Sequence, residues 1–120
     1  MIIEAAKAVL RVIGEEKLVE KACLQGSYLK ERLLGLQKKY PLIGDVRGMG
    51  LMVGLELVID ARKTPAKEKR DRLMGQAFEK GLLLLVAGES SPRLASPLII
   101  TKEQIDMGLS IIEDCLKKIC

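Results

Sequence analysis

A glycine-rich stretch from Leu42 to Val58 constrains the fold more than any other part of the chain. From Leu51 to Leu57 every second residue is leucine or valine, which is the period of a strand with one fully apolar face. Glycines ahead of this strand predict tight turns that fold a short lead-in around Val46 against it: Gly44, Gly48 and Gly50. The stretch therefore predicts the start of a sheet.

Gly54 interrupts the other face of the same strand. A glycine inside a strand is unfavourable unless a bulge, a neighbouring backbone or a ligand needs the space. The sequence thus marks Gly54 as a bulge or as a point of close approach, whereas Asp45 and Arg47 are predicted to be exposed turn residues.

Two helices are predicted before this strand. Apolar residues at helical spacing indicate a first helix from Ile2 to Ile13 that stops at Gly14, and a second from about Glu15 to Lys39 that Pro41 ends. The buried stripe of the second helix is Leu18, Ala22, Leu29, Leu33 and Leu36, with Gly26 in the same row, where a neighbour can approach closely. The first helix begins at the N-terminus, so the residues that cover its apolar face need not belong to this chain.

A third helix is predicted after a loop at 60–63. Thr64 is its expected N-cap, Pro65 its first residue and Gly81 its C-terminal stop. The charged run at 67–72 is expected to be solvated surface, and the core face is expected to be Leu73, Met74, Ala77 and Phe78.

Two strands and a last helix complete the predicted order. Leu82–Val86 is a continuous apolar run that fits a strand buried on both faces, and Arg93–Ile100, with Pro97 inside it, fits an edge or irregular strand. Thr101 and Gln104 form a capping box that opens a helix with one apolar face: Ile105, Leu109, Ile112, Leu116 and Ile119. We predict a single α+β domain over residues 1–120, in which helices cover one face of a small, mostly antiparallel sheet.

Composition narrows the possible functions. Aromatic residues make up 2% of the chain and its charges are mixed in sign, which argues against a nucleic-acid partner. The longest apolar run is too short to span a bilayer and the N-terminus does not resemble a signal peptide, so we expect no membrane partner and a cytoplasmic protein. With no histidine and no metal-ligand spacing of its cysteines, the chain is expected to hold no zinc site, and no metal-binding residue is predicted. A histidine-based nucleophile is excluded as well. Cys23 and Cys115 are expected to be buried and Cys120 exposed.

Arg93 is the one residue whose placement is energetically demanding. It lies in an apolar strand, and a half-buried guanidinium needs an anionic partner. Two alternatives are open: a structural ion pair with Glu89 or Glu56, or the binding of a substrate carboxylate through two parallel hydrogen bonds. No lysine is placed for a covalent bond to a carbonyl, no glycine-rich phosphate cradle is present, and the residues themselves show no catalytic centre.

Two stretches resemble the C-terminal small domain of the class III pyridoxal-phosphate aminotransferases, the group that acts on acetylornithine, ornithine or 4-aminobutyrate. They are Leu42–Val58, with the core Gly-Asp-Val-Arg-Gly-Met-Gly-Leu-Met-Val-Gly-Leu-Glu-Leu, and Pro92–Leu116. The resemblance implies that Arg93 holds the substrate carboxylate, although Pro92 and Ser96 depart from the family's usual residues. It assigns no catalytic and no cofactor-binding residue to this chain.

The resemblance also implies what such a chain lacks. The lysine that binds pyridoxal phosphate belongs in the family to a large domain that precedes these residues, so no cofactor is expected in this chain. We expect a fragment that is inactive alone, from a parent similar to 4-aminobutyrate aminotransferase, with amino-acid or 2-oxo-acid carboxylates as ligands and homo-oligomers or the missing domain as partners. The alternatives are a free-standing oligomerisation or small-ligand-binding module, and the remnant of an amino-acid racemase.

Overall fold

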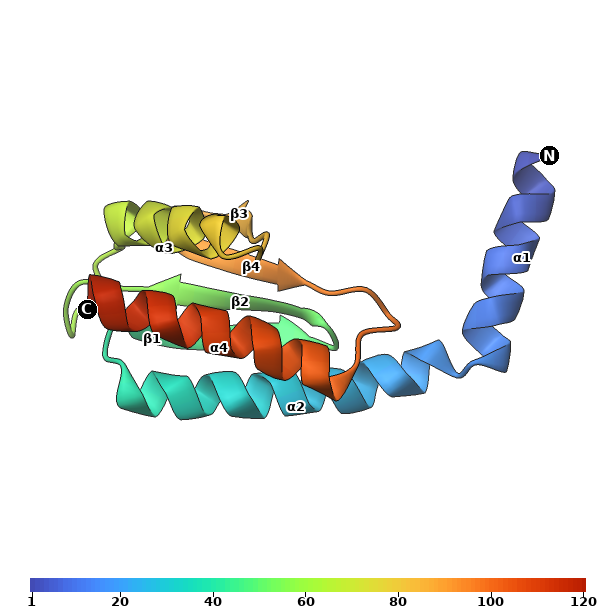
Figure 1. Cartoon of the computed structure of the whole chain (residues 1–120), viewed down its shortest axis with the longest axis horizontal. Coiled ribbons are helices and arrows are strands. Elements are labelled where there is room, and N and C mark those ends of the chain that lie inside the picture. Colours follow the sequence, from blue (N-terminus) through green and yellow to red (C-terminus); the bar gives the residue numbers. More distant parts are fainter.

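The computed structural model describes all residues from 1 to 120, and its element order is the predicted one (Figure 1). The elements are α1 (Ile2–Glu15), α2 (Leu18–Lys39), β1 (Ile43–Met49), β2 (Met52–Leu57), α3 (Lys67–Glu79), β3 (Leu85–Ala87), β4 (Ser91–Ala95) and α4 (Lys102–Ile119). The four strands form one antiparallel sheet in the order β1-β2-β4-β3. The predicted α+β class is confirmed.

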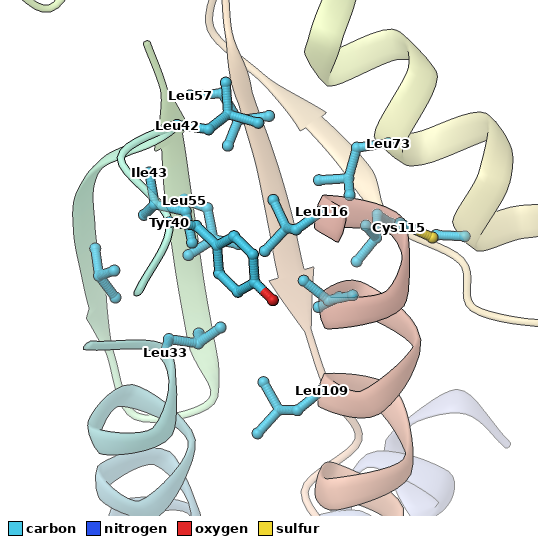
Figure 2. Close-up of a cluster of buried hydrophobic side chains, with 14 of the residues drawn as sticks. Leu33, Tyr40, Leu42, Ile43, Leu55, Leu57, Leu73, Leu109, Cys115 and Leu116 are labelled. Carbon is cyan, nitrogen blue, oxygen red and sulfur yellow. The ribbon is translucent and has the colours of Figure 1, made fainter. Parts of the chain in front are cut away.

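The core lies between one face of the sheet and the helices α2, α3 and α4. Leu33 from α2, Leu73 from α3 and Leu116 from α4 are fully buried, and they converge on Leu55 and Leu57 of β2 (Figure 2). Burying aliphatic side chains of this size is the main favourable term in folding. The predicted apolar faces of the central strand and of the last helix are therefore both confirmed.

Gly26 confirms the predicted close approach in α2. A Cβ atom there would lie 2.2 Å from the carbonyl oxygen of Gly50, which turns the chain between β1 and β2 with a φ of +56°. Only a residue without a side chain lets the helix pack this closely on the hairpin. The contact fixes α2 against the end of the sheet where the strands turn.

Helix α1 stands apart from the rest of the molecule (Figure 1). None of its residues is buried, and Lys17, with a φ of 51°, redirects the chain between α1 and α2. The sequence leaves open whether this chain covers the apolar face of its first helix, and the structure shows that face exposed. None of the four helices combines the length and the apolar character that crossing a membrane requires.

The start of α3 corrects the sequence prediction. The helix begins at Lys67 with Ala66 as its N-cap residue; Thr64 does not cap it but hydrogen-bonds Asp60, and Pro65 forms a bridge with Val58. Thr64 donates to the Asp60 carboxylate instead of capping α3, because aspartate readily closes a local turn of this kind. On the core face Leu73 and Ala77 are buried as predicted, but Phe78 is 68% exposed.

The strands after α3 correct two further predictions. The apolar run at 82–86 is not a strand buried on both faces: β3 is a three-residue edge strand, and Leu83, Leu85 and Val86 are exposed. β4 is an interior strand, not an edge, and residues 96–100 are not part of it. Pro92 is tolerated there because the pairing of β4 with β2 begins only at Arg93.

The cysteines and the charged run differ from expectation at single positions. Cys115 is buried and Cys120 exposed, as predicted, but Cys23 is exposed. Within the charged run, Arg70 is buried, because it turns inward towards the loop between β3 and β4. The capping box of Thr101 and Gln104 is present as predicted.

Candidate functional site

The face of the sheet opposite the helices carries a hollow of about 790 Å³. Strand alternation brings its central residues to this face, because the neighbouring Val53 and Leu55 point into the core. The hollow is lined by Arg47, Gly48, Met49, Met52, Gly54, Ala87, Gly88, Ser91 and Arg93. The predicted site residue and the glycine marked as a point of close approach therefore lie in one cavity.

Arg47, Gly54 and Arg93 form one row across three strands. Arg47 of β1 is the register partner of Gly54, and Gly54 is the register partner of Arg93 in β4. Neighbouring strands lie about 4.8 Å apart, so the two arginine Cα atoms are roughly 10 Å from each other across the glycine. Two guanidinium groups thus flank a position that has no side chain.

The charge of Arg47 is compensated within the chain. Its Nε lies 3.4 Å from an oxygen of Asp45, and its terminal nitrogen lies 3.4 Å from an oxygen of Glu56. Both Asp45 and Arg47 belong to β1, so the prediction that they are turn residues is wrong, although Arg47 is exposed. Two carboxylates of the chain therefore partly compensate the charge of Arg47.

Arg93 has no such compensation. It takes part in none of the ion pairs of the structure, and its Nε is buried without a hydrogen-bond partner. Of the two predicted partners, Glu56 pairs with Arg47, and Glu89 is exposed in the turn before β4. The predicted structural ion pair is wrong, and a half-buried guanidinium faces the hollow with its hydrogen-bonding capacity unused.

Arg70 binds Gly88, one of the residues that line the hollow. Its guanidinium donates to the Gly88 carbonyl at 3.1 Å and to Asp71, and it is only 6% exposed. Gly88 turns the chain from β3 into β4 with a φ of +63° and lines the hollow itself. Nothing in the sequence separates Arg70 from the solvated charges around it, so this role was missed.

The chemistry of the lining is that of an anion-binding wall. It contains two guanidinium groups and the Ser91 hydroxyl, but no lysine, cysteine or carboxylate. Such a set can bind and orient a carboxylate, whereas proton transfer or covalent catalysis needs groups that are not in this lining.

The comparisons with known proteins agree on one family. The family model described as aminotransferase class-III matches residues 2–116. The chain is 40% identical to the 5-aminovalerate aminotransferase DavT of Pseudomonas putida, over 96% of its own length and 28% of that protein. It is 39% identical to an isoleucine 2-epimerase of Lentilactobacillus buchneri, over 92% and 25%.

A solved structure shows the same relationship in space. The lysine aminotransferase from M. tuberculosis superimposes with a TM-score of 0.88 at 31% identity, over 97% of this chain and 25% of that one. The chain therefore spans about a quarter of the length of the relatives it matches.

Proposed function

The chain belongs to the class-III aminotransferase family, and from this membership we propose that it forms the wall that holds the substrate carboxylate, with Arg93 as the anchor. One observation carries the proposal: Arg93 is the guanidinium of the hollow that no carboxylate of the chain compensates. A guanidinium binds a carboxylate through two parallel charge-assisted hydrogen bonds, a geometry that also fixes the orientation of the ligand.

The reaction proposed for the whole protein is the transfer of an amino group between an amino acid and a 2-oxo acid. The similarity to a 5-aminovalerate aminotransferase supports an amino donor of the 4-aminobutyrate type. Racemisation of an amino acid is the second candidate, supported by the similarity to an isoleucine 2-epimerase. Both reactions need a fixed carboxylate, so the role of Arg93 is the same in either.

Pyridoxal phosphate, the cofactor of the family, supplies the electron sink for both reactions when it is bound. The lining of the hollow does not fit this group by itself, because it offers no lysine to bond the cofactor aldehyde. We therefore propose that a domain carrying that lysine completes the site and that the 120-residue chain alone is inactive. Incubating it with pyridoxal phosphate, 5-aminovalerate and 2-oxoglutarate should give no turnover; turnover, or stoichiometric bonding of the cofactor to one lysine, would refute the proposal.

A titration of the full chain with glutarate tests the anchor directly. The side-chain Nε–H signal of Arg93 in ¹H–¹⁵N spectra should shift in a saturable way, together with the backbone amide signals of Gly54 and Gly88 in the hollow. In Arg93→Gln the two backbone signals should no longer respond to glutarate. Arg62→Gln is the matched control, because Arg62 is an exposed arginine in the loop at 60–63. Equal binding by the Arg93→Gln variant and the unsubstituted chain would exclude the anchor role.

The bare face of α1 favours a second function, association through this helix. Ile2 is 87% exposed and Leu10 is 69% exposed, and a contiguous apolar surface of this kind promotes self-association. Sedimentation velocity should show oligomers whose population falls in a Val9→Ser/Leu10→Ser variant. A monomer at high concentration would rule this function out.

A further inference from the structure

We infer that Gly54 is a specificity-determining residue: its missing side chain leaves room for the carbon atoms next to the carboxylate that Arg93 holds. The inference rests on the proposed role of Arg93. It adds a limit on ligand size, which the space above Gly54 in the hollow sets. The ligand class is a short aliphatic carboxylate whose first carbons lie on the backbone of β2.

The fold itself gives no reason for a glycine at position 54. Its φ does not lie in the left-handed region, and the nearest atom to a Cβ built there is the carbonyl oxygen of Arg47, at 4.0 Å. Gly48, in the adjacent strand, is different: a Cβ there would lie 2.3 Å from the carbonyl oxygen of Met52. A Cβ atom therefore fits at Gly54, but not at Gly48, without disturbing the hairpin.

Strand stability argues against a glycine at this position. A glycine in a strand loses more conformational freedom on folding than other residues and gives its neighbours no side chain to pack against. A β-branched residue would suit an antiparallel strand better. The space above Gly54 is thus a feature that folding does not require.

The position of this space connects it with Arg93. A side chain at 54 would point to the bare face, between Arg47 on one neighbouring strand and Arg93 on the other. It would fill the part of the hollow beside the uncompensated guanidinium. Met49 and Met52, in the next row of the sheet, make the continuation of that space apolar. The geometry suits a carboxylate at Arg93 followed by methylene groups over Gly54.

Two carboxylic acids of different length show whether a substitution at Gly54 acts on the space above β2 or on the Arg93 guanidinium. Formate has no carbon beyond its carboxylate, whereas glutarate has a chain of methylene groups. Each acid is titrated into the full chain and into the variants Gly54→Ala, Gly54→Val and Gly75→Ala, and the Arg93 Nε–H signal is followed. Gly75 is the control, because it lies in α3 with open space around it and far from the hollow in the sequence.

We expect Gly54→Val to weaken glutarate binding about tenfold and formate binding by no more than about twofold, the discrimination that one or two misplaced methyl groups produce. Gly54→Ala should give an intermediate loss, and Gly75→Ala should give none. The denaturant midpoint of the Gly54 variants should not fall, which confirms that they fold.

Three results would overturn the inference. Unchanged glutarate binding by Gly54→Val would remove the size limit while leaving the Arg93 anchor in place. An equal loss for formate and glutarate would show that the substitution acts on the guanidinium instead of on the space beside it. No response of Arg93 to either acid in the unsubstituted chain would end the proposed function together with the inference.

Discussion

Helices α1 and α4 both present an apolar face along their length, but only α4 has its face covered. α4 buries six residues, among them Ile112 and Leu116, against the sheet and the neighbouring helices, whereas α1 buries none. The two helices look alike as sequence patterns, since periodicity shows only that a face needs a partner. Whether the partner belongs to the same chain is decided by the tertiary fold.

The polar groups of the two helices differ in the same way. Asp106 of α4 pairs with Arg32 of α2 at 2.9 Å, and Glu113 of α4 pairs with Lys39 at 2.5 Å. The ion pair of α1 joins Lys7 to Glu4 within the helix and connects it to nothing else. α4 also has a complete capping box, whereas no side chain caps the start of α1. α4 is thus fixed at its apolar face, its polar face and its N-terminus.

Truncating one leucine in each helix tests this contrast most strongly. Leu116→Ala should lower the free energy of unfolding by about 2–5 kcal/mol, because it leaves a cavity in a fully buried site. Leu10→Ala should change it by no more than about 0.5 kcal/mol, because that side chain is exposed. Chemical denaturation followed by circular dichroism measures both. Comparable losses in the two variants would mean that α1 packs on the rest of the chain.

Substituting two glycines of α2 compares a face of the helix that the chain covers, at Gly26, with one that it leaves open, at Gly35. Gly26→Ala should destabilise the fold by about 1–3 kcal/mol, because its Cβ would meet the Gly50 carbonyl, which is backbone and cannot move aside. Gly35→Ala should stabilise it by about 0.5–1 kcal/mol, because that position is open. Denaturant midpoints are the readout, and a neutral Gly26→Ala would refute the close packing of α2 on the hairpin.

The capping box of α4 should contribute less than either packing contact. Thr101→Ala removes the side-chain acceptor for the backbone N–H of Gln104 and should lower the free energy of unfolding by about 1 kcal/mol. Ser110→Ala, on the exposed side of the same helix, should stay within about 0.5 kcal/mol of the unsubstituted chain. Equal stability of the two variants would show that α4 is held by packing alone.

These contrasts explain which parts of the fold could be predicted from the sequence. The alternation from Leu51 to Leu57 and the helical spacing from Ile105 to Ile119 lie in elements that this chain covers. The Leu82–Val86 run has an equally strong apolar signal, but it lies at the edge of the sheet, where the chain covers Leu84 and leaves Leu83, Leu85 and Val86 exposed. Burial on both faces was therefore wrong there for the same reason that α1 is bare.

The sequence singles out Arg93 as a candidate site residue, and its role stays a prediction; its surroundings could not be predicted. Arg93 was identified because a guanidinium in an apolar strand needs an anionic partner. The sequence offered Glu56 as one such partner. The register decides otherwise: Glu56 sits opposite Asp45 in β1 and pairs with Arg47, which leaves Arg93 alone. Register and the inward turn of Arg70 depend on long-range pairing, which no local pattern encodes.

The polar contact between α4 and α2 should give the smallest effect, a dependence of stability on pH. The hydrogen bond from Lys39, reinforced by that from the Tyr40 hydroxyl, holds the pKa of Glu113 below its ordinary value. Because the unfolded chain then takes up the proton first, this contribution is complete above about pH 4.3, the ordinary glutamate value, and is lost as pH falls through the lowered pKa.

Denaturant midpoints measured at about pH 6 and about pH 3.5 isolate this contribution, since the two values lie on either side of the ordinary glutamate pKa. Glu113→Gln should show a smaller decrease between them than the unsubstituted chain. Glu4→Gln is the control, because the Glu4 carboxylate pairs with Lys7 inside α1 and ties that helix to no other element. If Glu113→Gln loses as much stability on acidification as Glu4→Gln, the contact of Glu113 with Lys39 adds nothing. The difference between the two helices would then lie in their apolar faces, their caps and the pair of Asp106 with Arg32.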